Sequence, residues 1–402
     1  MREAVEKCVH CGLCLPTCPT YQLLGCENDS PRGRIVLMKT VLEGKLSPNS
    51  TSEYIDNCLG CDACQTACPS GVEYGKLLTS YRAITDREKN SSFSQRLQSK
   101  IVSFTIPFPF RFRIAIRLGK LFRPLRGILP TFARPMIELV PDQIPKTVKV
   151  PEISPAIGQR RARVGLLLGC AQSVLAPQIN AATIRVLNRN GVEVIAPRNQ
   201  SCCGALDWHN GKLKQARKLA SLNFPLFPTD LDGIVINAAG CGSAFRDYSV
   251  MFAGTENEES ATRFGDQSID VSVFLDQLGL IGEPRFEKTT RVAYHDACHL
   301  IHAQGVSTPP RKILGAIENL DLIPLTDPDR CCGSAGTYNI DRPELAKQLG
   351  DLKAQSIVDS DCEIVAAGNI GCLVQIENRL KAVGSSQRVL HTIEILDSAY
   401  QS

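Results

Sequence analysis

Short, continuous apolar runs alternate with amphipathic segments through the C-terminal part of the chain. Val164–Gly169 and Val292–His295 are two such runs, and each is followed closely by a cysteine. Runs of this length are typical of strands that are buried on both faces. Ala181–Asn190 and Pro343–Val358 show helical spacing instead. Strands that alternate with helices predict α/β units with a mostly parallel sheet.

A second pair of apolar runs, Gly233–Asn237 and Glu363–Ala367, also leads into cysteines. Each cysteine of a first set has a counterpart 128 to 131 positions further on, which indicates two copies of one domain. We expect these cysteines in loops after strands, where open α/β sheets place their sites. The first set is Cys170, Cys202, Cys203 and Cys241, and the second is Cys298, Cys331, Cys332 and Cys372.

The N-terminal part carries a shorter cysteine repeat. The pattern C-x2-C-x2-C-x3-C-P occurs twice, once ending at Pro19 and once at Pro69. This is the bacterial ferredoxin pattern, in which the fourth cysteine of each run ligates the other cluster. Zinc sites need four ligands and do not use such interleaving. We expect two [4Fe–4S] clusters, one on Cys8, Cys11, Cys14 and Cys68, and the other on Cys18, Cys58, Cys61 and Cys64.

The residues between the two runs predict a helical ferredoxin module. Pro19–Asn57 is long for a compact β-hairpin ferredoxin, and Ser30–Glu43 has the start signals of a helix. Arg32 and Arg34 near its start have two interpretations: they screen the negative charge of a cluster, or they belong to a solvated basic turn.

Composition limits the class of protein. The chain has 402 residues, 43% apolar and 21% charged, which excludes a disordered or fibrous protein. Its net charge of +4 does not imply a nucleic-acid partner. Eighteen cysteines in ordered spacings favour metal ligation in a reducing compartment. The longest uncharged run, Val164–Ile184, contains polar residues and makes a poor membrane span, and no secretory signal is visible. We expect a cytoplasmic protein, or one attached peripherally to the cytoplasmic face of the inner membrane.

Several motifs together make the chain similar to the iron–sulfur subunit of glycolate oxidase (glycolate dehydrogenase), over nearly its full length. The motifs are Cys8-Val-His-Cys-Gly-Leu-Cys, Cys18-Pro-Thr-Tyr, Ser30-Pro-Arg-Gly-Arg-Ile, Cys68-Pro-Ser-Gly-Val, Gly169-Cys-Ala-Gln, Cys202-Cys-Gly-Ala, Gly240-Cys-Gly, Cys331-Cys-Gly-Ser-Ala-Gly-Thr-Tyr and Asn369-Ile-Gly-Cys. The resemblance implies partner subunits that carry FAD and oxidise glycolate to glyoxylate. This chain would relay their electrons towards a quinone-type acceptor, and it shows no flavin or nicotinamide motif of its own.

The wider superfamily includes heterodisulfide reductase subunits and the iron–sulfur subunits of glycerol-3-phosphate and lactate dehydrogenases, which are alternative functions. The heterodisulfide reductase pattern ends each set in C-x2-C, whereas Ala238 and Asn369 replace the first of those cysteines here. Three interpretations of the Cys-Cys-Gly sets stay open: further iron–sulfur clusters, structural zinc with His299 or His302 assisting Cys298, or metal-free thiols. A thiol–disulfide reductase would use these cysteines as metal-free thiols.

A basic segment, Lys89–Ile137, connects the two parts, with ten Lys or Arg and no Asp or Glu. It is a solvated linker face, a docking surface for the flavin subunits, or a membrane contact; it carries no nucleic-acid motif. Phe110–Arg117 alternates like a strand, whereas Ile114–Phe122 resembles a basic amphipathic helix. Pro141–Pro155 predicts an extended linker. The membrane interpretation uses Phe104, Phe108, Phe110 and Phe112.

We therefore predict an α+β multidomain protein. A helical two-cluster ferredoxin module (1–88) and a basic aromatic connector (89–160) come first. Two repeated α/β Cys-Cys-Gly domains follow, at 161–286 and 287–402.

Overall fold

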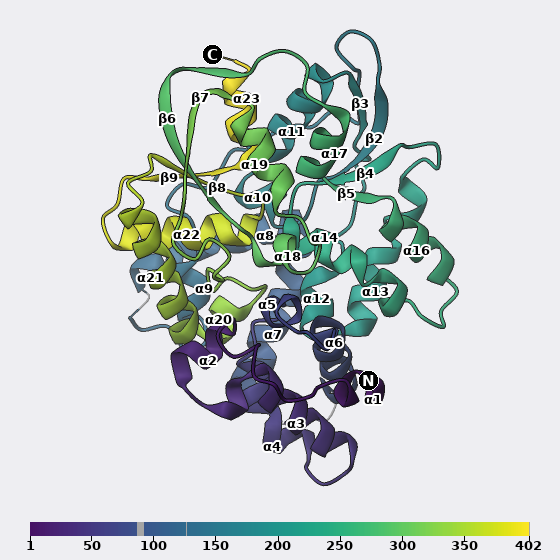
Figure 1. Cartoon of the computed structure of the whole chain (residues 1–402), viewed down its shortest axis with the longest axis vertical. Coiled ribbons are helices and arrows are strands. Elements are labelled where there is room, and N and C mark those ends of the chain that lie inside the picture. Colours follow the sequence, from purple (N-terminus) through teal and green to yellow (C-terminus); the bar gives the residue numbers. More distant parts are fainter. Residues whose placement is uncertain (87–91, 126, 402) are drawn as a thin grey trace.

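The computed structural model describes residues 1–86, 92–125 and 127–401. The N-terminal helical module lies at the bottom of Figure 1, and the two sheet domains lie above it. The predicted boundary between residues 88 and 89 falls outside the described residues, as do Lys89 and Arg126.

The N-terminal module is helical, as predicted. Ser30 begins the long helix after the first cysteine run, because its Oγ accepts a hydrogen bond from the Gly33 N–H at 3.0 Å. A side chain at Gly33 would place Cβ 1.9 Å from the Glu27 carbonyl oxygen, so only glycine fits there. The elements are α1 (Arg2–Glu6), α2 (Pro19–Leu24), η1 (Glu27–Asp29), α3 (Pro31–Leu42), α4 (Pro48–Asp56), α5 (Ala63–Thr66) and α6 (Tyr74–Thr85).

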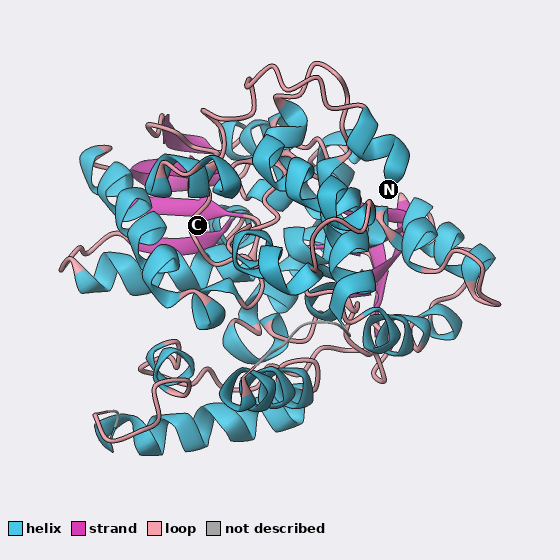
Figure 2. Ribbon diagram, turned by 90° about the horizontal axis from the view of Figure 1, so that it is seen from below, coloured by secondary structure: helices cyan, strands magenta, loops and turns pink. Residues whose placement is uncertain are grey.

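The connector is helical where the structure describes it: α7 (Phe93–Thr105), α8 (Pro109–Phe122), η3 (Arg123–Leu125) and α9 (Arg134–Glu138). The strand-like alternation of Phe110–Arg117 is therefore not realised. Pro109 at the first position favours helix, and Ile116 is buried against Val140 and Val174 on the inner face. These helices lie behind the other elements in Figure 1 and form the layer along the lower edge of Figure 2.

Two sheets follow. The first has the order β1-β3-β2-β4-β5, in which all neighbours are parallel except β1 with β3. The second has the parallel order β7-β6-β8-β9, which matches β3-β2-β4-β5 and bears out the predicted repeat. The strands are β1 (Ile153–Ser154), β2 (Ala162–Leu167), β3 (Val192–Ile195), β4 (Gly233–Ile236), β5 (Ser268–Asp270), β6 (Arg285–His295), β7 (Glu318–Ile323), β8 (Ile364–Ala367) and β9 (Arg388–His391).

Two sequence-based boundaries shift. The predicted linker Pro141–Pro155 contains β1, which pairs with Val194 and Ile195 at the edge of the first sheet. The second domain begins with β6 at Arg285, two residues before the predicted start at 287. The signal was weak because Arg285–Thr290 is polar and largely exposed; only the end of β6 enters the core.

Helices cover both sheets and join the domains. In the first domain they are α10 (Gln172–Leu175), α11 (Gln178–Arg189), α12 (Ala205–His209), α13 (Leu213–Ser221), η4 (Phe224–Leu226), α14 (Ala239–Arg246), α15 (Tyr248–Met251), α16 (Glu258–Asp266) and α17 (Val271–Leu278). In the second they are α18 (Cys298–Ile301), α19 (Thr308–Gly315), α20 (Tyr338–Asp341), α21 (Pro343–Asp359), α22 (Ile370–Ala382) and α23 (Thr392–Ala399).

The two sheet domains share one hydrophobic core. Helix α11 packs against α23, and their counterparts α19 and α17 pack in the same way. Polar contacts reinforce the joint: Arg185 donates to both carboxylate oxygens of Asp397, and His391 Nε2 lies 2.9 Å from the Asn237 carbonyl. No helix in the described part of the chain is long and apolar enough to cross a membrane.

Candidate functional site

The first cysteine run folds around a small cavity beside α3. Cys8, Cys11 and Cys14 line it, and Cys68 and Cys64 reach it from the second run. Left-handed backbone at His10 and Gly12 lets the loop turn tightly around this hollow. Burial raises the pKa of the Cys14 thiol. The interleaved quartet predicted from the spacing is thus brought together around one space.

The second quartet surrounds a neighbouring cavity. Cys18 from the first run meets Cys58, Cys61 and Cys64 from the second. Burial raises the pKa of the Cys61 and Cys64 thiols well above the usual range. Four thiols around a hollow fit the corners of an iron–sulfur cubane, and ligation as thiolates would remove the protons that burial otherwise retains.

Arg34 and Arg32 behave differently, although both stand near the start of α3. Arg34 is fully buried, and its guanidinium lies 3.9 Å from Cys18 Sγ and 3.2 Å from Asp29 Oδ1. Arg32 is more exposed and donates to Glu27 and to the His10 carbonyl. Of these two arginines, Arg34 is therefore the one that places a buried positive charge against the thiols of a quartet.

The first Cys-Cys-Gly set gathers at the ends of three strands of its sheet. Cys170 Sγ lies 3.5 Å from Cys202 Sγ, and Cys203 Sγ lies 3.2 Å from Cys241 Sγ. The hydrogen bond with Cys202, together with burial, raises the pKa of Cys170 well above its usual value. Gly204 is required in the turn, since its φ is +82° and a Cβ there would lie 2.6 Å from the Ala216 carbonyl oxygen.

The second set repeats this arrangement. Cys298 contacts Cys331, and Cys332 contacts Cys372. Gly333 has the same left-handed turn as Gly204, packed against the Ala346 carbonyl. The expectation that all these cysteines lie in loops was wrong for three of them, because Cys298 begins α18 and because Cys241 and Cys372 lie in the first turns of α14 and α22.

Histidines near the second set have separate partners. His299 Nε2 lies 2.9 Å from the Gly60 carbonyl and its Nδ1 lies 3.0 Å from Ser243 Oγ, while His302 Nδ1 lies 3.0 Å from Thr66 Oγ1. The contacts with Gly60 and Thr66 tie the second domain to the ferredoxin module, and the contact with Ser243 ties it to the first sheet domain. His295, which ends the apolar run Val292–His295, is the imidazole that lies close to Cys332 and Cys372.

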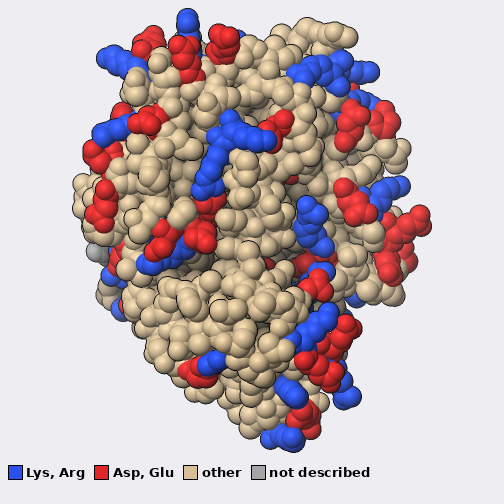
Figure 3. All heavy atoms as spheres, in the orientation of Figure 1, with Lys and Arg blue, Asp and Glu red and all other residues tan. Residues whose placement is uncertain are grey.

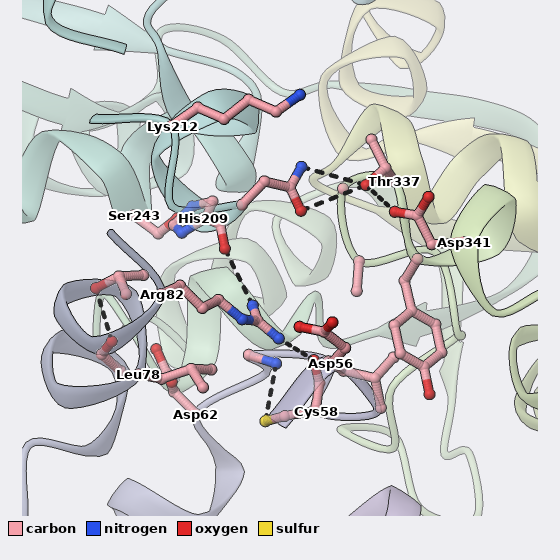
Figure 4. Close-up of a pocket in the computed structure, with 18 of the residues that line it drawn as sticks. Asp56, Cys58, Asp62, Leu78, Arg82, His209, Lys212, Ser243, Thr337 and Asp341 are labelled. Atoms are coloured by element: carbon pink, nitrogen blue, oxygen red, sulfur yellow. Dashed lines mark hydrogen bonds between the residues drawn. The ribbon is translucent and has the colours of Figure 1, made fainter. Parts of the chain in front are cut away.

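A polar cavity of about 780 Å³ lies where the ferredoxin module, α7 and both sheet domains meet (Figure 4). Cys58 lines this junction cavity as well as the second thiol cavity. Arg82 fixes one wall, because its guanidinium donates to the carbonyls of His209, Ile55 and Cys58. Sequence analysis did not find this cavity, since it exists only once the domains are packed together.

Comparisons with known proteins agree with these elements. A 4Fe-4S dicluster domain matches residues 4–72, and a cysteine-rich domain matches residues 164–246 and 292–377. The glycolate oxidase iron-sulfur subunit of Escherichia coli (strain K12) is 36% identical over 407 residues, 99% of this chain and 94% of that protein.

Two further relatives differ in coverage. The probable glycolate oxidase iron-sulfur subunit of Bacillus subtilis (strain 168) is 33% identical over 97% of this chain and 93% of its own length. Lactate utilization protein A of Oceanobacillus iheyensis is 29% identical and covers only 59% of this chain, although 97% of its own length is matched. The full-length match favours the glycolate oxidase group over the lactate alternative. The chain belongs to the family of glycolate oxidase iron–sulfur subunits, and it is an electron-transfer subunit of an oxidoreductase.

Proposed function

We propose that this subunit carries two [4Fe–4S] clusters, with cluster 1 on Cys8, Cys11, Cys14 and Cys68 and cluster 2 on Cys18, Cys58, Cys61 and Cys64. The observation that carries the proposal is the pair of neighbouring cavities, one lined by all four thiols of each interleaved quartet, with Cys64 between them lining both. Cubane clusters take up and release single electrons with little structural change. The chain's own part is to hold the thiols in place and to keep water away from cluster 2.

Electrons enter at cluster 1 from a flavin-containing partner that oxidises glycolate to glyoxylate. The loop around Cys11 supports this, because Cys11 is exposed and its neighbours Val9 and Leu13 are 67% and 58% exposed. In Figure 3 the centre of the lower part of the face is largely free of charged side chains, which gather along its lower right edge. An apolar rim around an exposed ligand loop suits a protein partner.

Electrons leave near cluster 2 to a quinone-type acceptor whose headgroup occupies the junction cavity. The shared lining residue Cys58 supports this exit, and the volume is in the range of small-molecule sites. Polar side chains from Ser243, Thr337 and Asp341 line the same space (Figure 4) and can hydrogen-bond quinone oxygens. Helix α7 forms the wall on the connector side through Gln98 and Ser99.

The electron path is tested by adding glycolate anaerobically to the purified complex of this chain with its flavin partner. We expect reduction of both clusters, seen as paramagnetic signals, and about eight iron atoms per chain. About twelve would place a third cubane on the all-sulfur set of Cys170, Cys202, Cys203 and Cys241. Clusters that stay oxidised with glycolate but are reduced by dithionite would refute the glycolate-linked relay.

The acceptor site is tested by Ser99→Phe, which fills the junction cavity from α7. The KM for a short-chain quinone should rise at least about tenfold, equivalent to about 1.4 kcal/mol of binding. Ferricyanide reduction, which needs no such site, should be unchanged. Ser94→Phe places the same side chain on α7 away from the cavity and is the matched control. An unchanged quinone KM in Ser99→Phe would exclude this cavity as the acceptor site.

The connector places the subunit peripherally on the cytoplasmic face of the membrane, through one side of α8. Phe110 and Leu121 are 79% and 70% exposed there, and Ile114, Leu118 and Leu125 continue the apolar stripe. Basic residues border the stripe, and acids are lacking throughout Lys89–Ile137. An apolar helix face bordered by cations suits anionic lipid headgroups over acyl chains.

Phe110→Ser combined with Leu121→Ser should reduce sedimentation of the full chain with vesicles containing phosphatidylglycerol by at least about tenfold. Each side chain contributes about 1.5–3 kcal/mol when it is fully buried, so this is a conservative expectation. The arginines make poorer targets, because Arg113 holds the Pro145 carbonyl at 2.8 Å. Leu222→Ser, an exposed leucine on the first sheet domain, is the control. If the double variant binds vesicles normally but no longer recovers the flavin partner, α8 is a subunit-docking surface.

A further inference from the structure

The last residue of β6, His295, brings an imidazole to the second Cys-Cys-Gly set. The side chain is fully buried, and its Nδ1 lies 3.1 Å from the Pro328 carbonyl oxygen. A carbonyl only accepts, so Nδ1 carries the proton and donates it. Nε2 is then left with a lone pair, and it has no hydrogen-bond partner. A buried acceptor without a partner is costly, so something that accepts this lone pair belongs at Nε2.

Two thiols face the same point. The donor atoms of His295, Cys332 and Cys372 all lie within 4.8 Å of one another, and all three residues are buried. Among the described residues, this is the only such group of three His, Cys, Asp or Glu donors. The ferredoxin quartets instead stand around open cavities. Donors this close together suit a single ion, whereas the ligands of a cubane are spread over four corners.

The surroundings are those of a metal site. The Nδ1–H bond to Pro328 is the second contact by which proteins fix the tautomer and direction of a ligating histidine. Asn369 Nδ2 donates to Cys372 Sγ at 3.5 Å, a bond that favours the thiolate. Cys331 lies outside this group of three donors but contacts both Cys298 and Cys332, so it is the neighbouring thiol that can supply a fourth donor.

The first set lacks this nitrogen. The residue at the end of β2 that corresponds to His295 is Leu167, and the residue that corresponds to Asn369 is Ala238. Both differences remove a polar group from the neighbourhood of the thiols. The two repeats therefore share a backbone and four cysteines but differ in chemistry.

We propose that the second set binds one Zn²⁺ through His295 Nε2 and the thiolates of Cys332 and Cys372, with Cys331 as the fourth ligand. Mixed imidazole and thiolate ligands are the usual zinc donors. Because zinc has no redox chemistry, this set holds the second domain together and lies off the electron path. The site is independent of the proposed relay, which uses only the ferredoxin clusters and the junction cavity.

The test is metal content of the anaerobically purified full-length chain, together with its zinc X-ray absorption spectrum. We expect about one zinc per chain, with one nitrogen and three sulfur neighbours. His295→Leu, which installs the residue of the first repeat, should lose zinc while iron stays at the wild-type value. His295→Cys should retain zinc, because a thiolate can replace the imidazole.

His299→Leu is the matched control, since His299 neighbours Cys298 but faces Gly60 and Ser243; its zinc should be unchanged. Cobalt substitution gives a second measurement, in which the visible ligand-field bands should change in His295→Cys. Zinc with four sulfur neighbours in the wild type, or full zinc in His295→Leu, would overturn the proposal. So would wild-type protein with iron but no zinc at this set. If His295→Leu does not fold, the wild-type absorption spectrum alone decides.

Discussion

Removing the thiol of Cys68 should cost the protein one cluster, about four iron atoms, together with glycolate-driven quinone reduction. Cys68 belongs to the second run by sequence but lines the cavity of the first. Cys68→Ala would leave cluster 1 with three thiols on a loop that is partly exposed to solvent and oxygen. Iron per chain and the paramagnetic signals after dithionite treatment measure the loss.

Double variants decide which thiols share a cluster. Adding Cys11→Ala to Cys68→Ala should cost no further iron, because both thiols line the same cavity. Adding Cys61→Ala should raise the loss to about eight iron atoms. If Cys68→Ala with Cys61→Ala loses no more iron than Cys68→Ala alone, each run ligates its own cluster and the interleaving is wrong. Cys26→Ala, which removes a cysteine that lines neither cavity, should keep all iron.

Fixed spacing made much of this architecture predictable. In the C-x2-C-x2-C-x3-C-P runs and the repeated Cys-Cys-Gly sets, the cysteines are separated by fixed numbers of residues, so the spacing can be read directly from the sequence. Strands β2, β4 and β8 were equally predictable, because strands buried on both faces are largely apolar. The secondary structure of the connector was harder to predict. Apolar residues lie on both the exposed and the buried side of α8, where Ile116 faces inward, so the sequence shows neither a clear helical nor a clear strand periodicity.

Features that depend on the packing of one domain on another could not be predicted from the sequence. The junction cavity needs residues from α6, α7, α12 and α20, which no local pattern connects. The role of His295 was not predictable for a different reason, because a single histidine at the end of a buried strand is usually a hydrogen-bonded structural residue. Aligning the repeats exposes it: the position is leucine in one copy and histidine in the other.

Arg34→Met should be the most damaging change outside the cysteines. The Arg34 guanidinium donates to the Tyr54 carbonyl, Thr20 Oγ1 and Asp29 Oδ1, at 2.7, 2.9 and 3.2 Å, in the buried wall of cluster 2. Methionine keeps much of the volume but leaves the Asp29 carboxylate buried without its cation. Breaking a buried pair from one side costs about 3–5 kcal/mol, so anaerobic unfolding of the variant should begin at a clearly lower temperature.

The same variant should lower the reduction potential of cluster 2. A positive charge 3.9 Å from Cys18 Sγ favours the more negative, reduced cluster. With an effective dielectric constant of about 20, a unit charge at this distance contributes at most about 4 kcal/mol, so its removal lowers the potential by up to roughly 170 mV for one electron. Redox titration followed by paramagnetic resonance measures this shift. An unchanged potential would mean that Arg34 only supports the fold.

Three companion variants separate charge from structure. Arg34→Lys keeps the charge, so the potential should stay near the wild-type value while stability falls. Arg34→Met with Asp29→Asn removes the stranded carboxylate, so it should recover a large part of the lost stability. Arg32→Met, two positions away on α3, removes an exposed ion pair worth at most about 1 kcal/mol and should leave cluster 2 unaltered. A buried arginine that acts on both stability and potential predicts this pattern, whereas a solvated basic turn predicts equal, small effects at both positions.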